Sequence, residues 1–202
     1  FAVSGLADRF PASRIFAVCA LLGAAANAGF AALASDVHSA LFYRFAVGLA
    51  LAGVYPLGMK LIVSWEPQRV GTALAWLVGM LTLGTSLPQG IRALGTAWPW
   101  QVPILAASTL AVIAALLIFR LGDGPHLKRK QGAPHLSLGR VFHAFTIPDF
   151  RAAALGYFGH MWELYAMWTL VPSLIVRAGL PQQLGVGVAA LAFAVIGIGA
   201  LG

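Results

Sequence analysis

Two charged residues stand inside stretches of sequence that are otherwise uncharged and largely apolar. Arg44 interrupts the stretch from residue 39 to residue 59, and Glu163 interrupts the stretch from residue 152 to residue 176. A charged side chain at the centre of a membrane helix costs roughly 2.5–3.5 kcal/mol on insertion scales, so it normally faces a cavity or a partner. If these stretches cross a membrane, Arg44 and Glu163 are candidates for a functional site.

Polar and aromatic residues cluster around Glu163. His160 and Glu163 have the i, i+3 spacing that places both on one face of a helix. A carboxylate beside an imidazole can take up and release a proton, although such a pair can also simply hold two helices together. Trp162 and Tyr165 are candidates for lining a solute path, with lipid contact as the alternative, and Gln89 is a further pathway candidate.

The sequence lacks the side-chain sets that most enzymes need. It contains no helical pair of histidines at metal-ligand spacing, no glycine-rich phosphate loop and no plausible pair of nucleophile and base. The single cysteine, Cys19, cannot form an internal disulfide or a cysteine-based metal site. We therefore expect no catalytic activity, no metal and no cofactor. An integral membrane enzyme and a non-transporting scaffold or sensor remain as alternatives to a transporter.

Composition places the chain in a membrane. Apolar residues make up 60% of its 202 residues and charged residues 9%, whereas a soluble domain carries about 25% charged residues. The mean hydropathy of +0.85 agrees. The net charge of +7 does not indicate nucleic-acid binding, because the basic residues lie in short breaks between apolar stretches and form no single basic face.

Six apolar stretches are long enough to cross a bilayer, which takes about 20 helical residues. They cover residues 15–35, 39–59, 70–91, 93–119, 152–176 and 178–202. They are apolar on all sides and longer than the alternating strands of a membrane barrel, so we predict an all-α, polytopic transmembrane bundle. Residues 1–7 are interpreted as the end of an earlier helix, and the chain as an internal fragment.

Basic residues predict the orientation of this bundle. Ten of the 13 lie beside alternate breaks, two (Arg92 and Arg177) lie beside the others, and the last is Arg44. Because basic residues are retained on the cytoplasmic side, the long break from residue 122 to residue 149 is predicted to be a cytoplasmic linker in a protein of the cell (inner) membrane. The helical spacing of Leu138, Val141, Phe142 and Phe145 predicts a short interfacial helix within it.

The first break resembles a signature of the major facilitator superfamily (MFS). Residues 4–14, Ser-Gly-Leu-Ala-Asp-Arg-Phe-Pro-Ala-Ser-Arg, are similar to the loop between that family's second and third helices, with Leu6-Ala7-Asp8-Arg9 in place but Ser4 and Pro11 at positions where the family has glycine. The resemblance implies that Asp8 caps and charge-pairs with neighbouring helices, while Arg9 and Arg14 face the cytosol.

Two further stretches resemble the same family. Arg44 and Gly48 match an Arg-x-x-x-Gly motif of its fourth helix, which implies that Arg44 is linked to proton or substrate coupling. The alternative is that Arg44 extends its side chain to the outer interface. Residues 79–90 loosely resemble the glycine- and proline-rich fifth helix. There, Pro88 would bend the helix and the glycines would permit close packing, with or without a part in gating.

These resemblances imply an organisation for the whole chain. Residues 1–121 would belong to the first half of a transporter, from the end of its second helix to its sixth, residues 122–149 to the linker, and residues 150–202 to its seventh and eighth helices. Such proteins carry a small solute by alternating access between their two halves. We expect a small-molecule solute, the lipid bilayer and protons as partners, no nucleic acid, and a monomer in the complete protein.

The predicted orientation is testable with epitope tags in the complete reading frame. A tag in the turn at Asp36 should be labelled on intact cells, whereas a tag beside Lys128 should be labelled only after permeabilisation, because basic residues stay on the cytoplasmic side. Labelling of both tags from the same side would contradict the proposed topology.

Overall fold

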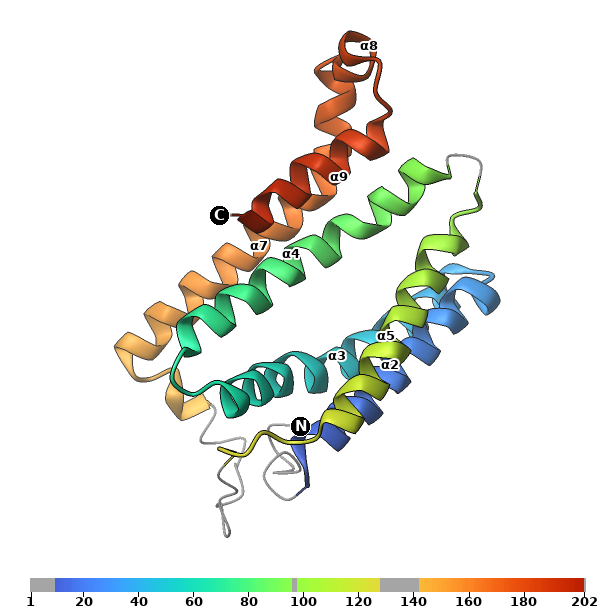
Figure 1. The fold of residues 1–202 in the computed structure, drawn as a ribbon. Helices are drawn as coiled ribbons and strands as arrows, with labels where there is room; N and C mark the ends of the chain where they lie inside the picture. The colour runs from blue at the N-terminus through green and yellow to red at the C-terminus, as the bar shows by residue number, and fades with distance from the viewer. Residues whose placement is uncertain (1–9, 96–97, 128–141, 202) are drawn as a thin grey trace. The chain divides into compact units, whose positions relative to one another are not determined.

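A computed structural model describes residues 10–95, 98–127 and 142–201. Its elements are α2 (Ala12–Leu33), α3 (Val37–Trp65), α4 (Val70–Leu94), α5 (Gln101–Leu121), α7 (Pro148–Arg177), α8 (Leu180–Leu184), α9 (Val188–Ile198) and the 3₁₀ turn η1 (Gly199–Leu201). Every regular element in these ranges is helical, which confirms the predicted fold class (Figure 1).

Some predicted features lie outside the described residues. These are the helix end expected at residues 1–7, Asp8, Arg9 and the part of the linker from residue 128 to residue 141, including Leu138 and Val141 of the expected interfacial helix. Within the described part of that segment, residues 142–144 are helical.

Four helices, α2 to α5, are long and apolar enough to cross a membrane. They correspond to the first four predicted stretches, although α5 begins at Gln101, eight residues later than expected, after the Trp98-Pro99-Trp100 sequence. Helix α7 has 30 residues, more than a span requires, but it is less apolar and does not join this group. Its lower hydropathy comes from the polar residues around Glu163 and the charges at its ends.

The last predicted membrane-length stretch, residues 178–202, does not form one long helix. The chain instead forms the one-turn helix α8, a short connection and the 11-residue helix α9. Gly179 and Gly185, which flank α8, have φ values of 66° and 65°. Glycine adopts this left-handed conformation without steric cost, so it ends helices where other residues would continue them. The Gly-Leu-Pro-Gln-Gln sequence of residues 179–183 predicts a short turn at the first break, whereas the second break, at Gly185, lies in apolar sequence and was missed.

The described helices group into two compact units. The first contains α2, α3, α5 and α4 up to Val78, and the second contains the rest of α4 with α7, α8 and α9. In the first unit α2 packs against both α3 and α5 (Figure 1). Its buried contacts are made by small residues, such as the cluster of Ala17, Ala20 and Ala115.

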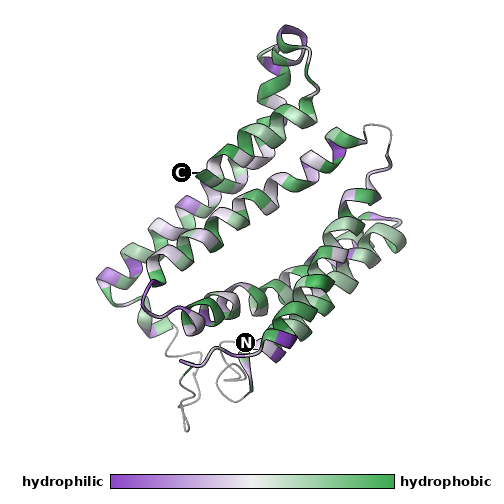
Figure 2. Ribbon diagram, in the orientation of Figure 1, coloured by the Kyte–Doolittle hydropathy of each residue, from purple (hydrophilic) through white to green (hydrophobic). Residues whose placement is uncertain are grey.

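Large apolar side chains lie mainly on the outside of these helices. Leu22 is 62% exposed and Leu41 is 63% exposed, whereas Ala115 is fully buried. Figure 2 shows apolar residues along the lengths of the helices, with the most hydrophilic residues of α2 and α5 towards the helix ends. This arrangement is typical of helices in lipid, where small residues permit close helix packing and large apolar side chains meet hydrocarbon.

In the second unit, α7 packs against α9 through Val171, Ile175, Ala192 and Ile196. The second part of α4 also lies against this region. A Cβ atom added to Gly79 would lie 3.2 Å from the carbonyl oxygen of Ala200, and one added to Gly90 would lie 2.9 Å from the ring of Phe193. Ser86 is fully buried between these two glycines. Small residues therefore allow the close approach of α4 to α9 and η1.

The polar turn at Asp36, which precedes α3, is stabilised by side-chain capping of the helix. The Asp36 carboxylate accepts hydrogen bonds from the backbone N–H groups of His38 (2.7 Å) and Ser39 (2.9 Å), and the Ser39 hydroxyl accepts one from the Asp36 N–H (3.2 Å). This reciprocal capping box satisfies N–H groups that a helix start leaves unpaired. The hydrogen bond from the Ser39 backbone lowers the pKa of the Asp36 carboxyl, to which the other hydrogen bonds add.

The alanine interface of α2 generates a stability prediction. Replacing buried Ala17 with leucine should destabilise the complete protein by about 1–3 kcal/mol, because the extra side chain cannot fit between the helices. The same substitution at exposed Ala25, on the same helix, should have little effect. Thermal unfolding in detergent measures both. Equal melting temperatures for the two variants would contradict the described packing.

Candidate functional site

Arg44 lies on α3 beside two residues of α2. Its Nη1 donates a hydrogen bond to Oδ1 of Asn27 at 3.3 Å, and its Cζ lies 3.8 Å from the centre of the Phe30 ring. A guanidinium at this distance from an aromatic ring is attracted by the negative face of the ring. The side chain is exposed in this unit, but its direction is set by these two contacts.

Asn27 connects three helices. Its Nδ2 donates to the carbonyl oxygen of Ile104 (3.2 Å) and to the hydroxyl of Ser108 (3.1 Å), both on α5, while its Oδ1 accepts from Arg44 on α3. The Ser108 hydroxyl in turn donates to the carbonyl oxygen of Ile104 at 2.9 Å. Sequence reasoning missed Asn27 and Ser108. Asn27 was detectable, because it is a polar amide in the middle of an uncharged stretch.

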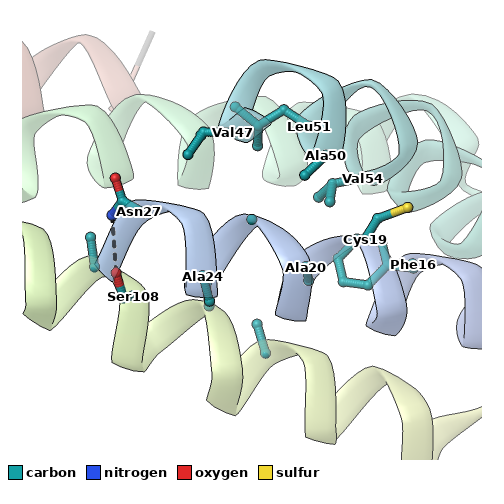
Figure 3. Close-up of a pocket in the computed structure, with 14 residues that line it drawn as sticks. Phe16, Cys19, Ala20, Ala24, Asn27, Val47, Ala50, Leu51, Val54 and Ser108 are labelled. Carbon is teal, nitrogen blue, oxygen red and sulfur yellow. Dashed lines mark hydrogen bonds between the residues drawn. The ribbon is translucent and has the colours of Figure 1, made fainter. Parts of the chain in front are cut away.

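A cavity of about 250 Å³ lies between α2, α3 and α5. Asn27 and Ser108 provide its polar lining, and most of the remaining wall is apolar, including Phe16, Val47 and Leu51 (Figure 3). Asn27 and Ser108 lie together at one end of the view, and Phe16 and Cys19 at the other. This space can take a small molecule that has an apolar body and one polar end.

Gly48, Pro88 and Gln89 do not join this cavity. An added Cβ at Gly48 would meet nothing within 4 Å among the described residues.

Helix α4 continues through Pro88. The hydroxyls of Thr85 and Ser86 donate to the carbonyl oxygens of Thr82 (2.7 Å) and Leu83 (2.8 Å) just before it. Proline removes a backbone N–H donor and such hydroxyls compete for carbonyl groups, so this segment of α4 is locally weakened. Gln89 is half-buried one position later.

His160 and Glu163 meet on one face of α7. The His160 Nδ1 and the Glu163 Oε2 are 3.9 Å apart, a distance suited to an ion pair when the imidazole is protonated. Their side chains are 60% and 80% exposed in this unit. Trp162 and Tyr165 on the same helix are also exposed, and the Tyr165 ring packs edge-on against Trp168 at 5.3 Å. The cluster lies on the helix before Val171 and Ile175, which pack against α9.

Polar contacts also gather at the N-terminal end of α2. Asp123, which follows α5, accepts hydrogen bonds from the backbone N–H groups of Ala12 (3.3 Å) and Ser13 (2.8 Å). Pro11, the N-cap residue, makes no side-chain capping bond, so Asp123 supplies that function from a distant part of the chain. Sequence analysis did not single out Asp123. Arg14, in the same turn, is exposed.

The segment after Asp123 is held against the end of α3. The Gly124 N–H donates to the Ser64 hydroxyl at 3.1 Å, and the His126 N–H donates to the Ser64 carbonyl oxygen at 3.3 Å. The Ser64 hydroxyl is buried and donates to the carbonyl oxygen of Leu61. A Cβ added to Gly124 would overlap Ser64. Only glycine fits this approach without a backbone shift.

Comparison with known proteins gives a family match and two relatives. The family model described as Major Facilitator Superfamily matches residues 1–202. A protein of Acinetobacter baylyi named "Niacin transporter NiaP" is 24% identical, over 87% of this chain and 47% of its own length. A protein of Bacillus subtilis named "Putative niacin/nicotinamide transporter NiaP" is also 24% identical, over 86% of this chain and 44% of its own length. The chain thus spans about half the length of these relatives, and no solved structure matches it.

The Gly124 contact generates a prediction for the complete protein. Gly124→Ala should lower the free energy of unfolding by about 1–3 kcal/mol, because moving the segment away from Ser64 leaves buried polar groups without partners. Gly71→Ala is the matched control, since a Cβ added to Gly71 would have no atom of the other described residues within 4 Å. Equal melting temperatures for the two variants would contradict the close approach at Ser64.

Proposed function

We propose, because this chain belongs to the major facilitator superfamily, that its complete protein moves a small solute across a membrane by alternating access, coupled to protons. The observation that carries this proposal is the family match over residues 1–202, on a chain whose helices α2 to α5 are long and apolar enough to cross a bilayer. The family and both relatives indicate a transporter and not an enzyme.

The relatives suggest a class of solute. Both are named for niacin, which is pyridine-3-carboxylate, and one is also named for nicotinamide, its uncharged amide. We take a small ring carboxylate of this kind as the proposed substrate. The cavity beside Asn27 and Ser108 supports the choice, because it is mostly apolar and carries its polar groups together at one end.

Glu163 and His160 are the proposed proton-coupling pair. Both are charged or polar residues on α7, a helix assigned here to the second half of the transporter, and they lie within ion-pair distance. A carboxylate that alternates between a bilayer-embedded and a water-exposed environment can bind and release one proton in each transport cycle. An imidazole 3.9 Å away can exchange that proton or balance the carboxylate charge.

The proposed organisation keeps the three segments expected from sequence. Residues 1–121 would contribute to the first half, residues 122–149 to a cytoplasmic linker, and residues 150–202 to the second half of a protein in the cell (inner) membrane. The supporting observation is the distribution of basic residues, which concentrate beside alternate breaks and above all in the long one. The complete transporter is proposed to act as a monomer.

The coupling role of Glu163 predicts a separation of two activities. In the complete protein, Glu163→Gln should abolish accumulation of pyridine-3-carboxylate against its gradient but leave exchange of labelled for unlabelled solute, because exchange needs no net movement of protons. Uptake driven by a pH gradient and counterflow exchange in proteoliposomes measure the two activities.

Asp149→Asn is the matched control, because Asp149 lies in the first turn of the same helix, away from His160. This variant should keep both activities. Unchanged accumulation by Glu163→Gln would refute the assigned coupling role, whereas a wild-type protein that moves no solute in either assay would refute the transport proposal itself.

A further inference from the structure

Arg44 carries a charge that the described part of the chain does not balance. Two ion pairs in that part join His38 to Asp36 and His160 to Glu163, and neither of the two includes Arg44. The neighbours of its guanidinium are the amide oxygen of Asn27 and the ring of Phe30, which are both uncharged. Arg44 lies seven residues after the start of α3 at Val37, about 10 Å along the helix. A cation at such a position in a membrane helix normally faces a cavity or has a partner, and an anion is a partner that would balance its charge.

The orientation of Asn27 is determined by its neighbours. The Ser108 hydroxyl donates its hydrogen to the Ile104 carbonyl, so it can only accept from Asn27, and the Ile104 carbonyl is also an acceptor. The amide nitrogen of Asn27 must therefore point to α5, and the amide oxygen must point to the guanidinium, which has no acceptor. This hydrogen-bonded chain runs from the buried Ser108 to Arg44 and holds one edge of the guanidinium in place.

Phe30 holds the flat face of the same group. The centre of its ring lies 3.8 Å from the Arg44 Cζ. The same ring packs edge-on against Trp100, with ring centres 5.8 Å apart. A guanidinium has five N–H donors in one plane, and the described contacts use one of them. Its remaining N–H groups can form the paired, parallel hydrogen bonds with which arginine binds a carboxylate.

The cavity next to this arginine suits the rest of such an anion. Asn27, the hydrogen-bond partner of Arg44, also forms the polar end of the cavity together with Ser108. An anion bound at Arg44 would therefore lie beside a space whose other walls are mainly small and aliphatic residues, including Ala20, Ala50 and Val54 (Figure 3). A carboxylate attached to a flat apolar ring matches this site, because the carboxylate would pair with the Arg44 guanidinium and the ring would contact the apolar wall of the cavity.

We propose that Arg44, oriented by Asn27 and Phe30, binds the carboxylate of the transported solute. This inference rests on the proposed function, and it assigns Arg44 to recognition of the solute's charge. The coupling of transport to protons stays with Glu163. The binding affinity for solutes that keep the ring but lack the negative charge should therefore depend much less on Arg44.

The test compares a charged solute with its uncharged analogue in the complete protein. Binding of pyridine-3-carboxylate and of pyridine-3-carboxamide is measured by calorimetry on purified wild type, Arg44→Gln, Arg44→Lys and the control Arg92→Gln, an arginine in the last turn of α4. Arg44→Gln should weaken carboxylate binding about 10- to 100-fold, the usual cost of losing hydrogen bonds to a charged group, and change amide binding less than about twofold. Arg44→Lys should lie between, and Arg92→Gln should match wild type.

Each result decides a separate point. Equal losses for the carboxylate and the amide would show that Arg44 only maintains the structure, and wild-type carboxylate affinity in Arg44→Gln would show that it is not needed. Either result overturns the inference and leaves the transport proposal standing. Wild-type protein that binds neither solute would overturn both the substrate class and this role. Melting temperatures confirm that each variant is folded, so a loss of binding is not mistaken for unfolding.

Discussion

The structure depends on one constraint, which is that hydrocarbon and not water surrounds most of its surface. In hydrocarbon every backbone N–H and C=O group must be paired within the protein, so long helices form. Large side chains such as Leu22 and Leu41 then cost nothing on the outside, whereas Ala17, Ala20 and Ala115 are needed where helices touch. The same constraint makes every polar group within a membrane-spanning helix costly unless it has a partner. The few polar side chains that do occur there are therefore the candidates for a function.

Those polar groups are arranged differently on the two units. In the first unit, Asn27 joins Arg44, Ser108 and the Ile104 carbonyl, so that α2, α3 and α5 are connected by hydrogen bonds beside a cavity. In the second unit, His160 and Glu163 are paired with each other and are exposed on α7. A fixed polar network suits recognition of a solute, and an exposed titratable pair suits transfer of a proton. The two proposed roles follow this difference.

Sequence predicted the features that depend on long apolar stretches and on charge. The helical class and the positions of α2 to α4 could be read from hydropathy, and two charges in apolar surroundings singled out Arg44 and Glu163 as candidates. The contacts of Asp123 with α2 and of Gly124 with Ser64 could not, because they join residues that are 60 or more positions apart and carry no local pattern. The turn that begins at Gly179 was visible in the sequence, but the break at Gly185 between α8 and α9 was missed, because that glycine changes the backbone without changing hydropathy.

The proposed function of the complete protein is to move a carboxylate solute across a membrane together with protons. Proton movement during transport by the complete, unmodified protein tests this most directly, using a pH electrode in a weakly buffered suspension of energy-depleted cells. Addition of the solute should make the medium transiently more alkaline as protons enter with it, and a protonophore should abolish the signal. Solute entry with no change in external pH would contradict proton-coupled transport.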